Sequence, residues 1–126
     1  MSKPTVAILG ASADRSKFGY KSVRAHQDHG FDVYPVNPKG GEIAGLTVYT
    51  SLSEVPVESL DRVSMYLPAA VGRRVLGEIV EKGCGEIWFN PGTEDAELLD
   101  EARQLGLNVI AGCSIVALGA SPADYD

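Results

Sequence analysis

The chain has 126 residues, 44% of them hydrophobic, and a formal net charge of −6 at pH 7. This length suits one domain that buries about two thirds of the surface exposed by its unfolded chain. The acidic balance argues against general nucleic-acid binding, and no apolar run approaches the roughly 20 residues that a membrane-spanning helix needs. The start, Met1-Ser2-Lys3-Pro4, lacks the apolar core of a secretion signal, so we expect a cytoplasmic protein with no membrane partner.

The charge is unevenly distributed along the chain. Residues 1–40 contain six Lys or Arg and three Asp, a balance of +3, whereas the remainder contains five basic and 14 acidic residues. The N-terminal part is therefore suited to hold a small polyanion, although Lys21 and Arg24 are also typical of a solvated helix surface.

Short apolar runs predict strands that are buried on both faces of a parallel sheet. In chain order these predicted strands are residues 6–9, 31–36, 63–67, 87–89 and 107–111, with a weaker candidate at 47–49. The runs are separated by segments with helical periodicity, so strands and helices alternate along the chain. This alternation predicts one Rossmann-like α/β domain over residues 1–126, a doubly wound parallel sheet with right-handed crossovers.

Two amphipathic patterns predict helices in the second half of the chain. The first apolar face consists of Val71, Val75, Leu76, Ile79 and Val80, and the second of Leu98, Leu99, Ala102 and Leu105. Gly30, Gly83 and Gly106 stand where a helix should end before the next strand.

The carboxyl ends of parallel strands share one edge, where such sheets bind ligands. The turn Gly10-Ala11-Ser12 follows the first predicted strand and leads into a helix, which is typical of a phosphate site. It is not a Gly-x-Gly-x-x-Gly motif, because Ser12 and Arg15 replace the later glycines. A tight turn with Ser12 as helix cap would look the same, so the motif by itself leaves both interpretations open.

The end of the second predicted strand indicates the kind of ribose that would be bound. An NAD-binding unit carries an acidic residue about 20 residues beyond its glycine turn, where it accepts hydrogen bonds from ribose hydroxyls. This sequence has Asn37-Pro38-Lys39 there. An amide and an ammonium suit a ribose that carries a phosphate, so the residues favour coenzyme A or NADP over NAD.

Other chemistries fit the sequence less well. The segment from Gly10 to Asp14 superficially resembles a hydrolase nucleophile elbow, but its fifth position is Asp14 rather than Gly. The histidines, His26 and His29, both lie on the helix just after this turn, so no triad is formed in the usual order. Without a further ligand the two histidines are expected to be a helix-surface pair rather than a metal site. Cys84 and Cys113 have no metal-ligand spacing and are expected to be reduced thiols.

Nearly the whole chain resembles the CoA-binding proteins related to the N-terminal CoA-binding domain of the succinyl-CoA synthetase alpha subunit. The segments that carry the resemblance are Val6-Ala7-Ile8-Leu9-Gly10-Ala11-Ser12 with Lys17-Phe18-Gly19-Tyr20, Val33-Tyr34-Pro35-Val36-Asn37-Pro38-Lys39, Gly45-Leu46 with Tyr49, and Leu67-Pro68-Ala69.

The resemblance implies a role for each matching segment. Gly10, Ala11 and Ser12 would hold the CoA diphosphate, and Asn37, Pro38 and Lys39 would lie near the adenosine ribose phosphate. Leu67, Pro68 and Ala69 would line the path of the nucleotide or of pantetheine. Arg15, Lys17 and Asn90 complete the set of candidate contacts.

The sequence also departs from the family pattern. The synthetase phosphohistidine belongs to a second domain that this sequence does not contain, and the last cysteine is reached through Ala111-Gly112-Cys113 rather than Asp-Arg-Cys. We therefore expect a module that binds CoA or an acyl-CoA without catalytic machinery of its own, as a homodimer or beside a synthetase-type partner. The alternatives are an NADP-dependent oxidoreductase and an NAD(H)-sensing module.

Overall fold

A five-stranded parallel sheet forms the centre of the computed structural model, which describes residues 3–126. Its strands are β1 (Thr5–Leu9), β2 (Asp32–Val36), β5 (Leu60–Met65), β6 (Cys84–Phe89) and β7 (Val109–Ala111), in the order β2-β1-β5-β6-β7. The order reverses between β1 and β5, and in such sheets the ligand crevice lies outside the carboxyl ends at this switch point. The predicted Rossmann-like α/β fold is thereby confirmed. Met1 and Ser2, half of the start interpreted above, lie outside the described residues.

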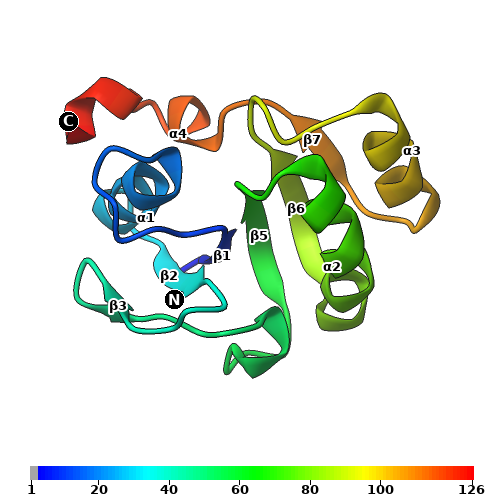
Figure 1. Ribbon diagram of the computed structural model, residues 1–126, viewed down its shortest axis with the longest axis horizontal. Coiled ribbons are helices and arrows are strands. Elements are labelled where there is room, and N and C mark those ends of the chain that lie inside the picture. The colour runs from blue at the N-terminus through cyan, green and yellow to red at the C-terminus, as the bar shows by residue number, and fades with distance from the viewer. Residues whose placement is uncertain (1–2) are drawn as a thin grey trace.

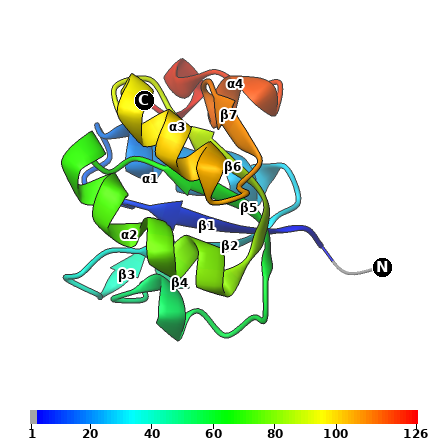
Figure 2. The same ribbon diagram turned by 90° about the vertical axis from the view of Figure 1, so that its right-hand side faces the viewer.

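Helices cover both faces of the sheet (Figures 1 and 2). The helix α1 (Phe18–Asp28) lies on one face together with the short α4 (Ser114–Ala117), whereas α2 (Ala69–Lys82) and α3 (Ala96–Gln104) lie on the other. The alternating side chains of β1 separate two apolar cores: Val6 and Ile8 pack with α1, and Ala7 and Leu9 pack with α2 and α3. The layers thus place the amino end of α1 directly beside the carboxyl end of β1.

The glycines predicted to end the helices do so. Gly30, Gly83 and Gly106 follow α1, α2 and α3 with φ of 84°, 82° and 87°, the left-handed conformation that suits glycine after a helix. Within residues 3–126, no helix is both long enough and apolar enough to cross a membrane.

The weak strand candidate at 47–49 does not extend the central sheet. Instead, β3 (Glu42–Ile43) and β4 (Leu46–Thr47) form an antiparallel hairpin of their own. The hairpin is tied to the end of β2, because Tyr49 N–H donates to Pro35 O and Asn37 N–H donates to Tyr49 O, each at 2.9 Å. Ile43 and Val48 join the core under α1. A long connection from β2 to β5 thus folds back along the edge of the sheet.

One expectation about a helix surface was wrong. His26 is fully buried rather than exposed, because the sheet-facing stripe of α1 runs through Gly19, Val23 and His26. Its Nδ1 lies 2.8 Å from Ser22 O, and its Nε2 lies 3.3 Å from Arg62 Nη1. His29 is exposed, as predicted.

The apolar faces predicted for α2 and α3 are only partly buried. Val71, Val80 and Leu105 are 36%, 41% and 46% exposed, whereas Leu76, Ile79, Leu98 and Ala102 form the buried stripe. These two helices cover only one face of the sheet, and each turns its outermost apolar positions to solvent.

Candidate functional site

A pocket of about 660 Å³ opens at the switch point, between the ends of β1, β2 and β5. We call it the main pocket. Eight of the twelve predicted contact residues line it: Gly10, Ala11, Ser12, Lys17, Asn37, Lys39, Leu67 and Pro68. These residues come from three loops far apart in sequence, and the parallel sheet brings them to one edge.

Two glycines allow α1 to begin against the turn that follows β1. Gly10 has φ of 86°, and a Cβ on it would lie 2.9 Å from the carbonyl carbon of Tyr66. A Cβ on Gly19 would lie 2.4 Å from Gly10 O, closer than real Cβ contacts allow. Gly19 therefore provides the close helix-to-strand packing that the third glycine of a dinucleotide motif normally allows. The sequence placed Gly19 in the predicted helix and in the resemblance, but did not indicate this contact.

The amino end of α1 presents free donors beside this turn. Lys17 is the N-cap and makes no side-chain capping bond, and none of the described residues accepts a hydrogen bond from the N–H of Phe18 or Gly19. Ser12 is not the cap, because its Oγ accepts from Asp14 N–H at 3.0 Å within the loop. The helix dipole and the free N–H groups suit an anion at this position.

Asn37 connects the two loops that form the main pocket. Its Nδ2 donates to Ala11 O at 2.8 Å, and its Oδ1 accepts from Lys39 N–H at 2.9 Å. Both ends of the amide are therefore engaged within the protein, and the side chain sets the position of Lys39. Within residues 3–126 no ion pair engages Lys17 or Lys39, so both ammonium groups are available to a ligand.

The other predicted contacts lie outside the main pocket. Pro38 lines a neighbouring apolar hollow of about 210 Å³, and the Arg15 guanidinium lies 5.9 Å from the centre of the Tyr20 ring. Ala69 begins α2 and is half-buried. Asn90 is 2% exposed, and its amide donates to Ser64 Oγ and Met65 O at 2.9 Å. A ligand contact by any of these four residues stays a prediction.

Two further hollows extend the crevice along the edge of the sheet. One of about 460 Å³ shares Gly10, Lys17, Tyr66 and Pro68 with the main pocket. It continues into a small hollow of about 80 Å³ that is lined by Phe18, Tyr66, Asn90, Pro91 and Cys113. The crevice thus runs from Lys39 at one end to Cys113 at the other. Cys84 and Cys113 are both free thiols, as predicted.

Some pocket residues were missed by sequence reasoning. Tyr66 follows β5 at the centre of the crevice; its hydroxyl lies 3.2 Å from Ser114 Oγ, and burial raises its pKa. Asp14 accepts hydrogen bonds from the hydroxyl and, to a smaller effect, the backbone N–H of Ser16, which lower the pKa of Asp14. Glu42 reaches the main pocket from the hairpin. For Glu42 the sequence signal was the preceding pair Gly40-Gly41, which indicates a turn but not the position of the next residue in the fold.

The parallel sheet, the glycine turn and the crevice at the switch point define a doubly wound α/β domain of the class that holds its ligand at the carboxyl edge. The chain belongs to the family described as CoA binding domain, which matches residues 4–119. The resemblance noted from the sequence is thereby confirmed.

Relatives include both longer proteins and proteins of this size. The chain is 32% identical to the alpha subunit of acetate–CoA ligase [ADP-forming] I from Pyrococcus furiosus, over 94% of this chain but 29% of that subunit. It therefore spans less than a third of the length of this relative. A structure titled as a conserved hypothetical protein from the same organism has a TM-score of 0.82 and 34% identity, covering 90% of this chain and 98% of that one.

A ligand-bound structure has lower structural and sequence similarity to this chain. The dinucleotide forming acetyl-coenzyme A synthetase 1 of Ca. Korarchaeum cryptofilum, in complex with phosphate and ADP, has a TM-score of 0.72 and 28% identity. The match covers 86% of this chain and 25% of that chain. Domains similar to this chain thus occur both within longer CoA ligases or synthetases and as chains of similar length.

Proposed function

We propose that this chain binds coenzyme A, or an acyl-CoA, along the crevice at the carboxyl edge of its sheet. One observation carries the proposal: Lys17 and Lys39, which form no ion pair within residues 3–126, line the 660 Å³ main pocket, and the free amino end of α1 lines the adjoining 460 Å³ hollow. Coenzyme A carries a diphosphate and a separate ribose phosphate, so it needs two anion sites. Membership of the CoA-binding family supports the same ligand.

The diphosphate would lie on the turn after β1. Gly10 lets the backbone approach the phosphates closely, and the N–H groups of Phe18 and Gly19 are free to donate to them. Lys17 adds a positive charge at the same point. Backbone donors at a helix amino end, with a cation nearby, are a common arrangement for holding phosphate.

The adenosine would lie on the β2 side of this turn. Lys39 would meet the ribose 3′-phosphate, because it lines the main pocket beyond the turn and no ion pair among the described residues engages it. The adenine would enter the 210 Å³ hollow, whose walls include Val36, Leu52, Leu67 and Val71. The hydroxyl-bearing Thr50 and Ser51 also line this hollow and would offer polar partners to the ring.

The pantetheine arm would follow the crevice in the opposite direction. The 460 Å³ hollow continues from the main pocket past Phe18, Pro68 and Pro91, and ends at the small hollow beside Cys113. This route places the thiol end of the ligand far from the ribose site. Because some relatives that share this domain are subunits of an acetate–CoA ligase, we propose a role as a CoA site that acts alone or for a synthetase-type partner subunit.

Calorimetric titration with CoA, NAD and NADP tests the proposal. We expect CoA to bind and NAD to give no measurable heat, because the Asn37-Pro38-Lys39 strand end favours a phosphorylated ribose. Binding of NAD equal to or tighter than that of CoA would overturn the proposal. A clear preference for NADP would favour the oxidoreductase alternative. Mass spectrometry of the natively purified protein, before and after denaturation, would identify any retained nucleotide and any co-purifying subunit.

A further inference from the structure

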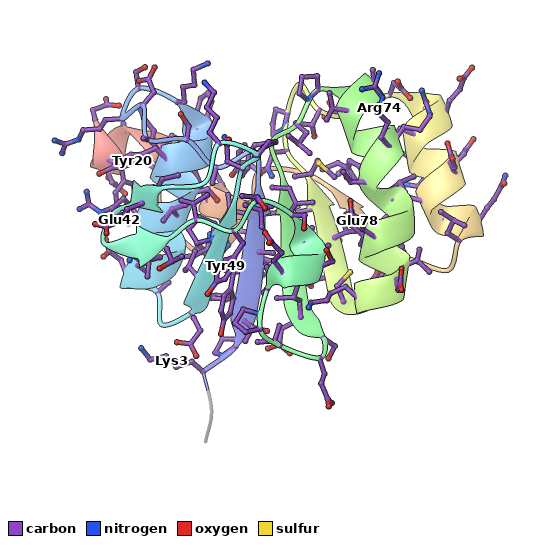
Figure 3. All side chains as sticks on the ribbon, turned by 60° about the horizontal axis from the view of Figure 1, so that its bottom comes forward. Lys3, Tyr20, Glu42, Tyr49, Arg74 and Glu78 are labelled. Carbon is purple, nitrogen blue, oxygen red and sulfur yellow. The ribbon has the colours of Figure 1, made fainter. Side chains whose placement is uncertain are left out.

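The hairpin β3–β4 brings a second carboxylate, besides that of Asp14, into the main pocket. Glu42 lies five residues after Asn37 in the sequence and lines the main pocket together with Lys39. Figure 3 shows Glu42 on the same side of the sheet as Tyr20 of α1, opposite Arg74 and Glu78 of α2. An acidic residue is therefore present near the ribose site, although it does not follow β2 directly as in NAD-binding units.

The backbone around Glu42 is held firmly. Val48 N–H donates to Gly41 O at 2.9 Å, and Gln27 Nε2 on α1 donates to Ala44 O at 3.3 Å. Next to Glu42, Ile43 is 5% exposed and packs in the core under α1. Glu42 thus belongs to a hairpin that is hydrogen-bonded to α1 and to the end of β2, rather than to a free loop.

Glu42 is also an uncommitted acceptor. Among the described residues, none forms a hydrogen bond or ion pair with its carboxylate, whereas Asn37 and Asp14 of the main pocket each use one side-chain oxygen to accept from the protein's own N–H groups. Asn37 Oδ1 already accepts from Lys39 N–H at 2.9 Å, and Asp14 Oδ1 accepts from Ser16 N–H at 3.0 Å. A ligand hydroxyl in this part of the pocket would therefore find its acceptor in Glu42.

We infer that Glu42 selects a ribose that carries its phosphate on the 3′ position and a free hydroxyl on the 2′ position. The inference rests on the proposed function, in which Lys39 meets the 3′-phosphate. The neighbouring 2′-hydroxyl would donate to Glu42, whereas a phosphate at the 2′ position would be repelled by the carboxylate. Lys39 would attract a ribose phosphorylated at either position. Glu42 would then favour binding of the 3′-phosphorylated isomer over the 2′-phosphorylated one.

Two isomeric ligands isolate this effect: adenosine 3′,5′-bisphosphate and adenosine 2′,5′-bisphosphate, which differ only in the position of one phosphate. Their affinities are measured by displacement of fluorescent CoA from the wild type, Glu42→Gln and Glu81→Gln. Glu81 is exposed on α2 and lines a separate hollow, so its substitution matches the loss of charge outside the main pocket.

We expect the wild type and Glu81→Gln to prefer the 3′-isomer by about tenfold or more, the loss typical of one charge-assisted hydrogen bond. In Glu42→Gln this preference should fall to within about threefold, mainly through tighter binding of the 2′-isomer. An unchanged preference in Glu42→Gln, with CoA still bound, would overturn the inference about Glu42 alone. Failure of CoA itself to bind the wild type would instead overturn the proposed function, and the inference with it.

Discussion

The backbone of Lys39 is positioned by the side chain of Asn37. The Asn37 side chain accepts the Lys39 N–H and donates to Ala11 O, so one amide aligns the turns that follow β1 and β2. The sequence suggested Asn37 as a ligand contact. The structure shows that its hydrogen-bonding groups are engaged, which makes Lys39 the charged contact on this rim.

Substitution of Lys39 tests this assignment. Lys39→Ala should weaken CoA binding by about tenfold to 150-fold, the range for a charge-assisted hydrogen bond. Binding of dephospho-CoA, which lacks the 3′-phosphate, should hardly change, and both affinities are measured by calorimetry. Raised salt should narrow the difference between the wild type and the variant, because the side chain is exposed. Equal weakening for both ligands would mean that Lys39 supports the diphosphate or the loop instead.

The helix α1 depends on one contact at its first turn. Gly19 passes so close to the turn after β1 that a Cβ would lie 2.4 Å from Gly10 O and 3.3 Å from Ala11 Cα. Both of these atoms belong to backbone, so neither can move aside cheaply. The same contact positions the free N–H groups of α1 beside the proposed diphosphate site.

Gly19→Ala should therefore lower both stability and affinity. We expect unfolding in urea to show a loss of about 1–3 kcal/mol, typical of overpacking, and CoA binding to weaken as α1 moves away from the turn. Gly77→Ala is the matched control, because nothing lies within 4 Å of a Cβ at that helical position. This control should gain about 0.5–1 kcal/mol from helix propensity and leave affinity unchanged. A Gly19→Ala protein as stable as the wild type would contradict the packing described.

A partly buried polar cluster connects α1 to the central strands and affects the stability of the whole molecule. The Arg62 guanidinium lies 5.1 Å from the ring centres of both Phe31 and Trp88, and its Nε donates to Glu86 Oε1 at 2.7 Å. His26 packs on this cluster and is fully buried. Burial, helped by the positive charge of Arg62, lowers the pKa of His26 from its usual 6.5 to about 4.

The lowered pKa of His26 predicts a loss of global stability in acid. The unfolded chain protonates this histidine near pH 6.5, whereas the folded protein resists protonation until about pH 4. The stabilisation is therefore fully present above pH 6.5 and is lost as the pH falls to 4, by about 3 kcal/mol in total. Urea unfolding of wild type, His26→Asn and the exposed control His29→Asn at several pH values measures it. His26→Asn should lack this part of the pH dependence; equal slopes in all three proteins would contradict the assignment.

The architecture and much of the site could be predicted from sequence alone. Buried parallel strands appear as short apolar runs, helix ends appear as glycines, and a glycine turn between a strand and a helix indicates an anion site, because each pattern depends on residues close together in the chain. Strand ends must share an edge in a parallel sheet, so Gly10, Asn37, Lys39 and Pro68 could be assigned to one crevice.

Tertiary structure decided what depends on contacts between distant segments. The hairpin placed Glu42 in the main pocket because Tyr49 pairs with the end of β2 and Ile43 packs under α1. His26 became a buried neutral group because α1 turns that face toward Arg62 on β5. The Asn37 amide donates a hydrogen bond to the carbonyl of Ala11, 26 residues earlier in the sequence. Periodicity shows which residues lie on one face of an element, but only packing determines what each face meets.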